Sequence, residues 1–293
     1  MSIRSIKKII PARRVNMGGH ILDQPLPVPG IESIDPFLLI HHWDEPISPG
    51  GQQNEMGVGP HPHRGFSPVT FIFKGTLRHQ DSQGNTAVIS EGGTQWMHAG
   101  RGIVHSERPG IDLVKNGGDQ EFIQFWVNTP SKYKMEAPYY LPMTKEDTPK
   151  IMEKGAEIAV VAGTYKAIKG PAKVYSPQTL LRVKADKHSN LYVALPKTYN
   201  TLLYVLNGGL LINEKKISAK DMVWFENNAE SIHIESLEQT NFIILSGEPI
   251  NENVSAYGPF VMNSQDEINQ AVLDYQNGKM GVLHERFDRL NRS

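Results

Sequence analysis

The sequence predicts an all-β protein built from two tandem β-barrels, with one short helix late in the chain. Three observations support this fold class. Short apolar runs recur between glycine and proline turns, the two halves of the chain resemble each other, and one segment has the spacing of an amphipathic helix.

The apolar runs have the length and composition of β-strands. Each is about five residues long and rich in β-branched and aromatic side chains. Glycine (26) and proline (20) residues are spread through the chain and separate these runs. The pattern is typical of a β-sandwich or barrel. The runs are VTFIF (69–73), TAVIS (86–90), EFIQFWV (121–127), EIAVVAG (157–163), TLLYVL (201–206), DMVWF (221–225) and NFIILS (241–246).

The halves of the chain echo each other. FIFKGTL (71–77) aligns with YVLNGGL (204–210), and each is a strand that runs into a glycine turn. A tryptophan and a histidine nine residues apart follow in each half, ending at His105 in the first and His233 in the second. This internal repeat favours a duplicated barrel over two unrelated domains.

A polar, charged stretch divides the halves. Residues 131–150 contain prolines and many charges, so we place a domain boundary near residue 140. The prediction is an N-terminal metal-binding barrel over residues 1–140, and a C-terminal metal-free barrel, with the helix, over residues 141–293.

One helix is expected in the second half. Ser264 and Glu267 have the spacing of a capping box. Ile268, Val272 and Tyr275 follow at helical spacing, and Gly278 is expected to end the helix.

The bulk composition excludes several classes of protein. Apolar residues make up 39% and charged residues 21%, as in a globular chain and unlike a disordered one. The 30 basic and 31 acidic residues balance, so we expect no direct nucleic-acid binding. The absence of cysteine excludes disulfides, thiolate metal sites and cysteine nucleophiles. With no signal peptide and no membrane-spanning run, we expect a cytoplasmic protein.

Two pairs of metal-binding side chains have the spacing of strand neighbours. In GPHPHRGF (59–66), His61 precedes a proline, which favours an extended backbone. Residues i and i+2 of an extended segment face the same side, so His61 and His63 project together. By the same argument, His105 and Glu107 of the segment AGRGIVHSERP share a face. Two such pairs on facing strands would surround one point with three imidazoles and a carboxylate.

This set of three nitrogens and one oxygen suits a first-row transition metal such as Fe, Mn, Ni, Co, Cu or Zn. Four protein ligands can leave coordination positions open to small molecules, as a catalytic site requires. A single H-x-H pair is more often an ordinary surface feature than a metal site. The metal interpretation therefore depends on the two pairs together.

The remaining histidines have weaker cases as ligands. His41 and His42 follow an apolar run and are expected in the core or at its rim. His79 stands in the turn-like segment RHQDSQGN and is expected to be solvated. His98 is a candidate to contact the ligands and orient them without binding the metal itself. In the second half, ALPKTYNT (194–201) stands where the first half has its H-x-H pair, and it contains no histidine.

At these residues the sequence resembles the pirin family, a group of two-barrel proteins within the cupin superfamily. The resemblance implies two cupin-type (jelly-roll) barrels and one metal, usually iron, held by His61, His63, His105 and Glu107. The matching stretches cover much of the chain and are HPHRGF (61–66), QWMHAGRGIVHSE (95–107), QFWVN (124–128) and YGPFVMNSQDEINQAVLDYQNGKMG (257–281).

One residue departs from the wider cupin pattern. Many cupins carry a further glutamate ligand shortly after the H-x-H pair, and Ser67 stands at that spacing here. Glu107 therefore has to supply the carboxylate.

The resemblance implies a metal-dependent dioxygenase similar to quercetin 2,3-dioxygenase. A flavonol would bind through its 3-hydroxyl, Glu107 would accept the proton as general base, and dioxygen would cleave the ring with loss of carbon monoxide. Arg64 faces away from the ligands in a regular strand, so we assign it no catalytic role.

Two rival hypotheses remain. One is a non-catalytic, redox-sensitive metal-binding regulator that acts through a protein partner. The sequence displays no distinctive charged or apolar partner surface for that role. The other is a purely structural two-barrel protein, which has no need for four converging ligands.

Overall fold

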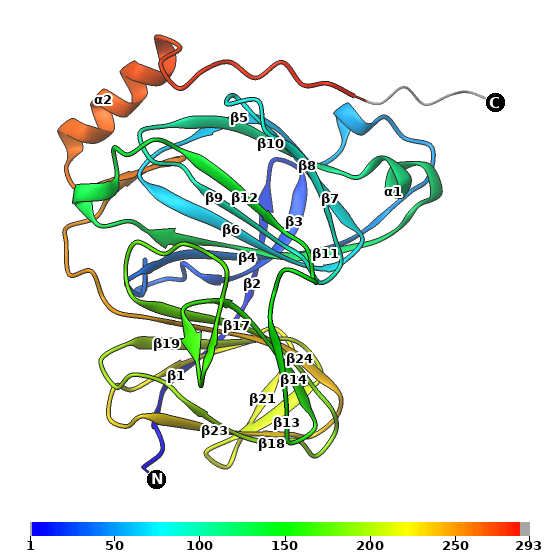
Figure 1. The fold of residues 1–293 in the computed structure, drawn as a ribbon, viewed down its shortest axis with the longest axis vertical. Coiled ribbons are helices and arrows are strands. Elements are labelled where there is room, and N and C mark those ends of the chain that lie inside the picture. Colours follow the sequence, from blue (N-terminus) through cyan, green and yellow to red (C-terminus); the bar gives the residue numbers. More distant parts are fainter. Residues whose placement is uncertain (1, 288–293) are drawn as a thin grey trace. The chain divides into compact units, whose positions relative to one another are not determined.

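A computed structural model describes residues 2–287 of the chain. Strands dominate these residues, and each of the seven predicted apolar runs coincides with a strand (Figure 1). Two runs match whole strands: TAVIS is β8 (Thr86–Ser90) and DMVWF is β22 (Asp221–Phe225). The predicted all-β fold is confirmed.

The chain forms two compact units, each assembled from two separate stretches. The N-terminal barrel contains His42–Lys145 and the described residues from Asn251 on. The C-terminal barrel contains Glu146–Ile250 together with the chain up to His41. A single boundary near residue 140 predicts two contiguous domains. In the structure, the N-terminal segment belongs to the C-terminal barrel, and the segment after Ile250 belongs to the N-terminal barrel. The chain passes from one unit to the other between residues 145 and 146, close to the expected position.

The strands of the N-terminal barrel belong to a larger sheet with the order β12-β9-β6-β11-β4-β3-β2 and a smaller sheet with the order β5-β10-β7-β8. Its strands are β4 (Phe37–Ile47), β5 (Val58–His63), β6 (Phe66–Lys74), β7 (Thr76–Asp81), β8, β9 (Thr94–His98), β10 (Ile103–Pro109), β11 (Gly118–Asn128), β12 (Tyr139–Met143), β25 (Ser255–Tyr257) and β26 (Phe260–Met262). Its helical elements are α1 (Ile111–Asn116), α2 (Gln265–Gln276) and the 3-10 turns Gln53–Glu55 and Ser131–Tyr133.

The C-terminal barrel has sheets with the orders β1-β22-β19-β24-β17-β14-β13 and β18-β23-β20-β21. Its strands are β1 (Ile6–Pro11), β13 (Lys150–Glu153), β14 (Ala156–Ala162), β17 (Gln178–Ala185), β18 (Asn190–Ala194), β19 (Asn200–Asn207), β20 (Gly209–Ile212), β21 (Lys215–Ser218), β22, β23 (Ser231–Ser236) and β24 (Thr240–Gly247). β15 (Thr164–Tyr165) and β16 (Ile168–Lys169) form a separate hairpin. β2 (Arg13–Met17) and β3 (His20–Leu26) pair with each other and continue the seven-stranded sheet beyond β4.

The strand orders confirm the internal repeat. Adding thirteen to each strand number turns β5-β10-β7-β8 into β18-β23-β20-β21, and it turns β9-β6-β11-β4 into β22-β19-β24-β17. The two barrels therefore share one topology, with the core of each between a larger and a smaller sheet.

The expected match of His105 with His233 is wrong by one residue. The equivalent leucines of β7 and β20 pair with Pro109 in one barrel and with Ser236 in the other. Four positions before these partners stand His105 and Ile232. His233 is thus one residue out of register.

A shift of one residue moves a strand side chain to the opposite face of the sheet. Ile232 and Ile234 accordingly lie fully buried in the core of the C-terminal barrel. His233 points the other way, stacks on the exposed Tyr192 at 4.4 Å between ring centroids, and hydrogen-bonds Asn190. Apolar side chains therefore occupy the interior positions that correspond to His105 and Glu107.

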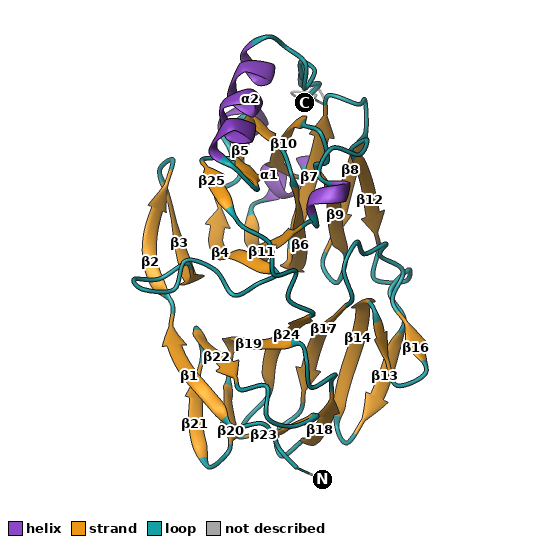
Figure 2. Ribbon diagram, turned by 90° about the vertical axis from the view of Figure 1, so that its left-hand side faces the viewer, coloured by secondary structure: helices purple, strands orange, loops and turns teal. Residues whose placement is uncertain are grey.

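The predicted helix forms as α2, and its capping box is complete. Ser264 Oγ accepts a hydrogen bond from the backbone N–H of Glu267, whose carboxylate accepts one from the backbone N–H of Ser264. Ile268 and Ala271 of this helix share a buried apolar cluster with Val104 of β10. Figure 2 shows α2 beside β5 and β10. The helix thus covers the N-terminal barrel, whereas the sequence assigned it to the C-terminal one. The apolar residues that bury it come from β10 and from the segments that precede and follow the helix.

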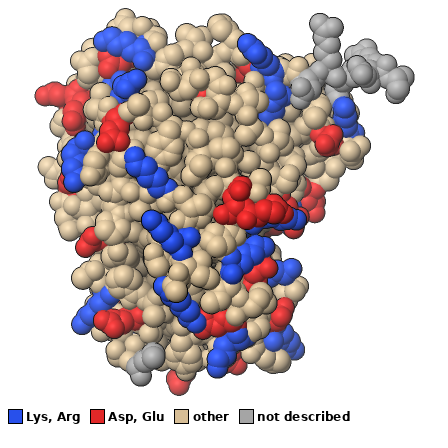
Figure 3. Space-filling view, viewed as in Figure 1, with Lys and Arg blue, Asp and Glu red and all other residues tan. Residues whose placement is uncertain are grey.

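The surface carries both signs of charge. On the face shown in Figure 3, basic and acidic side chains are interspersed. Among residues 2–287, no helix is long and apolar enough to cross a lipid bilayer.

Candidate metal centre

Three neighbouring strands bring the predicted site residues to one face of the smaller sheet. His61 of β5 lies directly opposite His105 of β10, and His105 lies opposite Asp81 of β7 on its other side. Directly opposed residues of an antiparallel pair point to the same face. The alternation expected from the sequence therefore places His61, His63 and His105 together.

The three imidazoles are close enough to hold one metal ion. One nitrogen from each of His61, His63 and His105 lies within 4.8 Å of the other two. The ring centroids are 4.3 Å apart for His61 and His105, and 5.0 Å for His63 and His105. His63 and His105 are buried and His61 is partly exposed, so the group has one side open to solvent.

Hydrogen bonds fix which nitrogen of each ring is free. His61 Nδ1 lies 2.8 Å from the carbonyl oxygen of Gly59, and His63 Nδ1 lies 3.3 Å from that of Pro259. A carbonyl can only accept, so Nδ1 of each neutral ring carries the hydrogen and Nε2 keeps its lone pair. Nε2 of His63 is buried and has no hydrogen-bond partner among residues 2–287. A buried lone pair of this kind fits a metal ligand.

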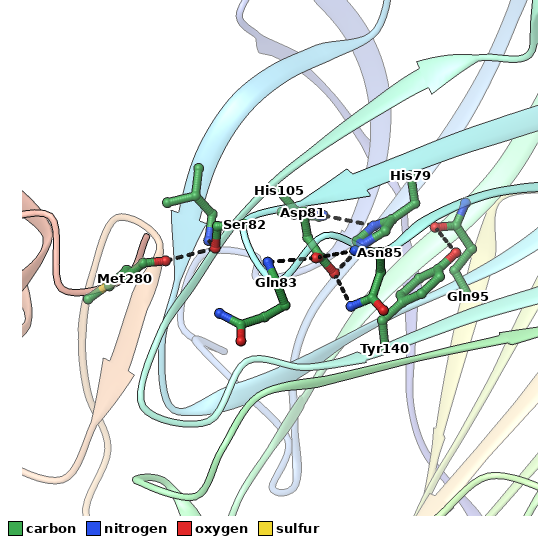
Figure 4. A network of polar contacts seen from close by, with 10 residues as sticks. His79, Asp81, Ser82, Gln83, Asn85, Gln95, His105, Tyr140 and Met280 are labelled. Atoms are coloured by element: carbon green, nitrogen blue, oxygen red, sulfur yellow. Dashed lines mark hydrogen bonds and ion pairs between the residues drawn. The ribbon is translucent and has the colours of Figure 1, made fainter. Parts of the chain in front are cut away.

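His105 is oriented by a second histidine (Figure 4). Asp81 Oδ2 accepts a hydrogen bond from His79 Nε2 over 2.9 Å, which leaves His79 Nδ1 as an acceptor. His105 Nδ1 lies 3.4 Å from that atom and donates to it. Nε2 of His105 is consequently the free nitrogen, and it too is buried without a partner among the described residues.

Burial keeps the inner imidazoles neutral. Removal from water, followed by the nearby charge of His61, lowers the pKa of His63 well below 6.5. The same two causes, with smaller effects of His63 and His79, lower the pKa of His105. Neutral imidazole is the form that binds a metal.

Glu107 occupies a different position from the three histidines. It is buried on β10, but it does not belong to the group of nitrogens within 4.8 Å. The pairing of β10 with β5 shifts register between His105 and Glu107. Gln124 donates to one carboxylate oxygen over 2.8 Å, and Thr70 donates to the other over 3.4 Å. Glu107 therefore has its own set of hydrogen-bond donors.

An aromatic surface lies beside the histidines. Trp126 of β11 is partly exposed. Its indole lies tilted against Phe66 at 4.3 Å and meets His63 edge-on at 5.3 Å between centroids. Its Nε1 lies 3.4 Å from Gln124 Oε1, and Gln124 in turn holds Glu107. The apolar run EFIQFWV did not indicate which of its residues face this site. The structure identifies Gln124 and Trp126.

The expectation that His79 is solvated is wrong. His79 is 1% exposed, because Tyr140 stacks on it with ring centroids 3.8 Å apart and an angle of 2° between the planes. Burial, together with the charges of Glu107 and Asp81, raises the pKa of Tyr140. The signal that identifies His79 is its i, i+2 spacing to Asp81 on a strand next to β10.

The other histidines contribute no ligand atom to the group. His98 is buried and lies 3.3 Å from Ser67 Oγ through its Nδ1. His42 is fully buried and His41 partly so, as expected of core and rim positions. Arg64 points away from the site and binds Asp274 of α2 at 2.9 Å, in agreement with its predicted orientation.

A second cluster of potential ligands, His42, Asp44 and Glu121, lies on the larger sheet. Its central carboxylate is already compensated. Glu121 pairs with Lys74 at 3.0 Å through one oxygen and with His42 at 3.1 Å through the other. Burial alone would raise the pKa of Glu121, but these two hydrogen bonds outweigh it and lower the pKa to about 2. The ammonium group of Lys74 thus already neutralises the carboxylate that a metal ion would need.

The two barrels of shared topology, one with a buried group of three histidines, define a two-barrel protein of the cupin class. Residues 20–127 match the pirin family model, and residues 180–281 match the model of the pirin C-terminal cupin domain. The chain belongs to the pirin family.

Similar proteins include both pirins and quercetin dioxygenases. A pirin-like protein of Solanum lycopersicum is 34% identical over 96% of this chain and 94% of its own length. A Pseudomonas aeruginosa protein provisionally named quercetin 2,3-dioxygenase is 36% identical over 86% of this chain and 89% of its own. The crystal structure of a quercetin 2,3-dioxygenase from Acinetobacter baumannii has a TM-score of 0.89 at 32% identity, and the match covers 96% of this chain and 99% of that one.

Proposed function

We propose that this protein is a metal-dependent dioxygenase of the pirin type, which cleaves flavonols such as quercetin with dioxygen. One divalent transition metal, iron in the first place, would be held by His61, His63 and His105, with Glu107 as the fourth ligand. Mn, Ni, Co, Cu and Zn also suit nitrogen and oxygen ligands. The observation that carries the proposal is the set of three Nε2 atoms left free by hydrogen bonds at Nδ1.

The bound metal would supply Lewis acidity towards the flavonol 3-hydroxyl and a path for electrons to dioxygen. The protein supplies position and proton transfer. Glu107 lies on the same strand as His105, so its carboxylate can receive the proton of the 3-hydroxyl. Gln124 keeps one oxygen of that carboxylate hydrogen-bonded and thereby fixes its orientation.

We assign flavonol binding to the aromatic surface formed by Trp126 and Phe66. A flavonol is planar and aromatic, and a partly exposed indole beside His63 offers a face on which such a ring can stack. His61 lies on the exposed side of the histidine group, where a small molecule can approach.

The test is anaerobic reconstitution with Fe(II), Mn(II), Ni(II), Co(II) or Cu(II), followed by quercetin and dioxygen with detection of carbon monoxide. We expect carbon monoxide from at least one metal form, and strong loss of it in the Glu107→Gln variant. The His233→Ala variant, altered on the outer face of the other barrel, serves as the matched control. Absence of carbon monoxide with all five metals would contradict the proposal.

A further inference from the structure

His79 and Asp81 form a buried, hydrogen-bonded pair next to the metal-binding histidines. Both residues lie on β7, two positions apart, so their side chains share the face that carries the metal-binding histidines. They are 1% and 3% exposed. Burying a carboxylate and an imidazole is costly unless they satisfy each other and a third group. Here the third group is His105.

We propose that Asp81 and His79 form an orienting relay that holds the metal ligand His105 in its metal-binding tautomer. This inference rests on the proposed metal centre and assigns positioning roles within it. Asp81 fixes the hydrogen of His79 on Nε2, and His79 Nδ1 then accepts the hydrogen of His105 Nδ1. His105 Nε2 is left bare and directed away from the relay. Neither Asp81 nor His79 would touch the metal.

Tyr140 keeps the middle member of the relay in plane. Its ring is parallel to that of His79 at 3.8 Å, and its hydroxyl donates to Gln95 Oε1 over 3.1 Å. The imidazole of His79 therefore cannot rotate without losing the stack, and its two nitrogens stay aligned with Asp81 and His105. Figure 4 shows the four side chains in this arrangement.

Asp81 also closes the turn that follows β7, and the test has to separate the two roles. Oδ1 accepts hydrogen bonds from the backbone N–H groups of Gln83 and Asn85. Oδ2 accepts one from the side chain of Asn85 at 2.9 Å, in addition to the one from His79. Substitution of Asn85 thus weakens the turn and leaves the relay intact.

The experiment measures Co(II) binding to the full-length chain by competition titration, together with the visible absorption of the bound Co(II). Asp81→Asn keeps one acceptor oxygen for the two backbone N–H groups of the turn. Its amide nitrogen replaces Oδ2, so His79 faces a donor and the tautomers reverse. We expect its Co(II) affinity to fall about 10- to 100-fold, the usual effect of removing a group behind a metal ligand. The Co(II) absorption band should shift, because the His105 nitrogen changes orientation.

Two further variants test the relay independently of Asp81→Asn. His79→Phe preserves the stack on Tyr140 without either nitrogen, and we expect the same loss of Co(II) affinity. Asn85→Ala should retain wild-type affinity and absorption. The relay is overturned if folded Asp81→Asn and His79→Phe bind Co(II) as wild type does, or if Asn85→Ala loses affinity as much as Asp81→Asn.

The outcomes also separate the relay from the proposed function. If wild type binds Co(II), His105→Ala abolishes binding and the relay variants have no effect, the metal centre stands and the relay fails. If wild type binds no Co(II), both fail.

Discussion

Arg64 Nη1 lies 2.9 Å from Asp274 Oδ2, and this ion pair joins the strand that carries His63 to helix α2. Both side chains are at most 10% exposed. Arg64 Nε also donates to the carbonyl oxygen of Arg101 over 2.7 Å. Helix α2 is thereby tied to the segment next to the histidine group.

Loss of one partner of this buried pair should be strongly destabilising, because the other charge stays buried without compensation. We expect Asp274→Ala to lower the free energy of unfolding by about 3–5 kcal/mol. Urea denaturation measures this change. The control Asp266→Asn, at an exposed position of the same helix, should change stability by less than about 1 kcal/mol. Equal losses in both variants would mean that the ion pair contributes nothing specific.

Gly65 should tolerate no side chain. Its φ is +89°, and a Cβ atom there would collide with the backbone carbonyl of Val261. Gly84 has a similar φ of +88° but open space around it. We expect Gly65→Ala to lower the free energy of unfolding by several kcal/mol. Gly84→Ala should cost only about 1–2 kcal/mol for its backbone conformation. The difference between the two midpoints of thermal unfolding isolates the collision, and no difference would contradict it.

Glu121 should make stability depend on acid pH. Its pKa in the folded protein is about 2, below the ordinary value of 4.5, so its stabilising effect is complete above about pH 4.5. That effect is lost as the pH falls from there towards 2, because the unfolded chain then binds the proton more readily. Unfolding free energies measured across this range should fall less steeply for Glu121→Gln than for wild type. A wild-type slope in Glu121→Gln would refute the assignment of this pH dependence to Glu121.

Gln124 should affect catalysis without affecting metal content. Gln124→Leu removes the 2.8 Å hydrogen bond to Glu107 and leaves the three histidines unchanged. A hydrogen bond to a charged group contributes about 1.5–3 kcal/mol, so we expect the rate of flavonol cleavage to fall about 10- to 100-fold. The bound metal per chain should stay at the wild-type value. A parallel loss of metal would show that Gln124 acts through metal binding and not through proton transfer to Glu107.

Much of the fold could be predicted from the sequence because strand signals are local. The apolar runs, their glycine turns and the capping box at Ser264 each depend on a few neighbouring residues, and each was confirmed. The exchange of the chain ends between the barrels depends on long-range contacts, such as Arg64 with Asp274. No local pattern reports such contacts.

The candidate site divides in the same way. The i, i+2 spacing was sufficient to place His61 and His63 on one face, because alternation along a strand is a local property. His105 joins them through the pairing of β10 with β5, which sets it directly opposite His61. Cross-strand register is not local. For that reason the sequence predicts a solvated His79 and a match of His233 with His105. The pairing of β7 with β10, together with that of β20 with β23, reverses both conclusions.

The central claim is that three histidines of the N-terminal barrel hold one metal ion. Its most direct test is the metal content of the full-length chain after reconstitution and removal of excess metal. We expect one ion per chain for wild type and for His233→Ala, and a small fraction of that for His63→Ala and His105→Ala. A full equivalent of metal in folded His63→Ala, or its loss in His233→Ala, would contradict the claim.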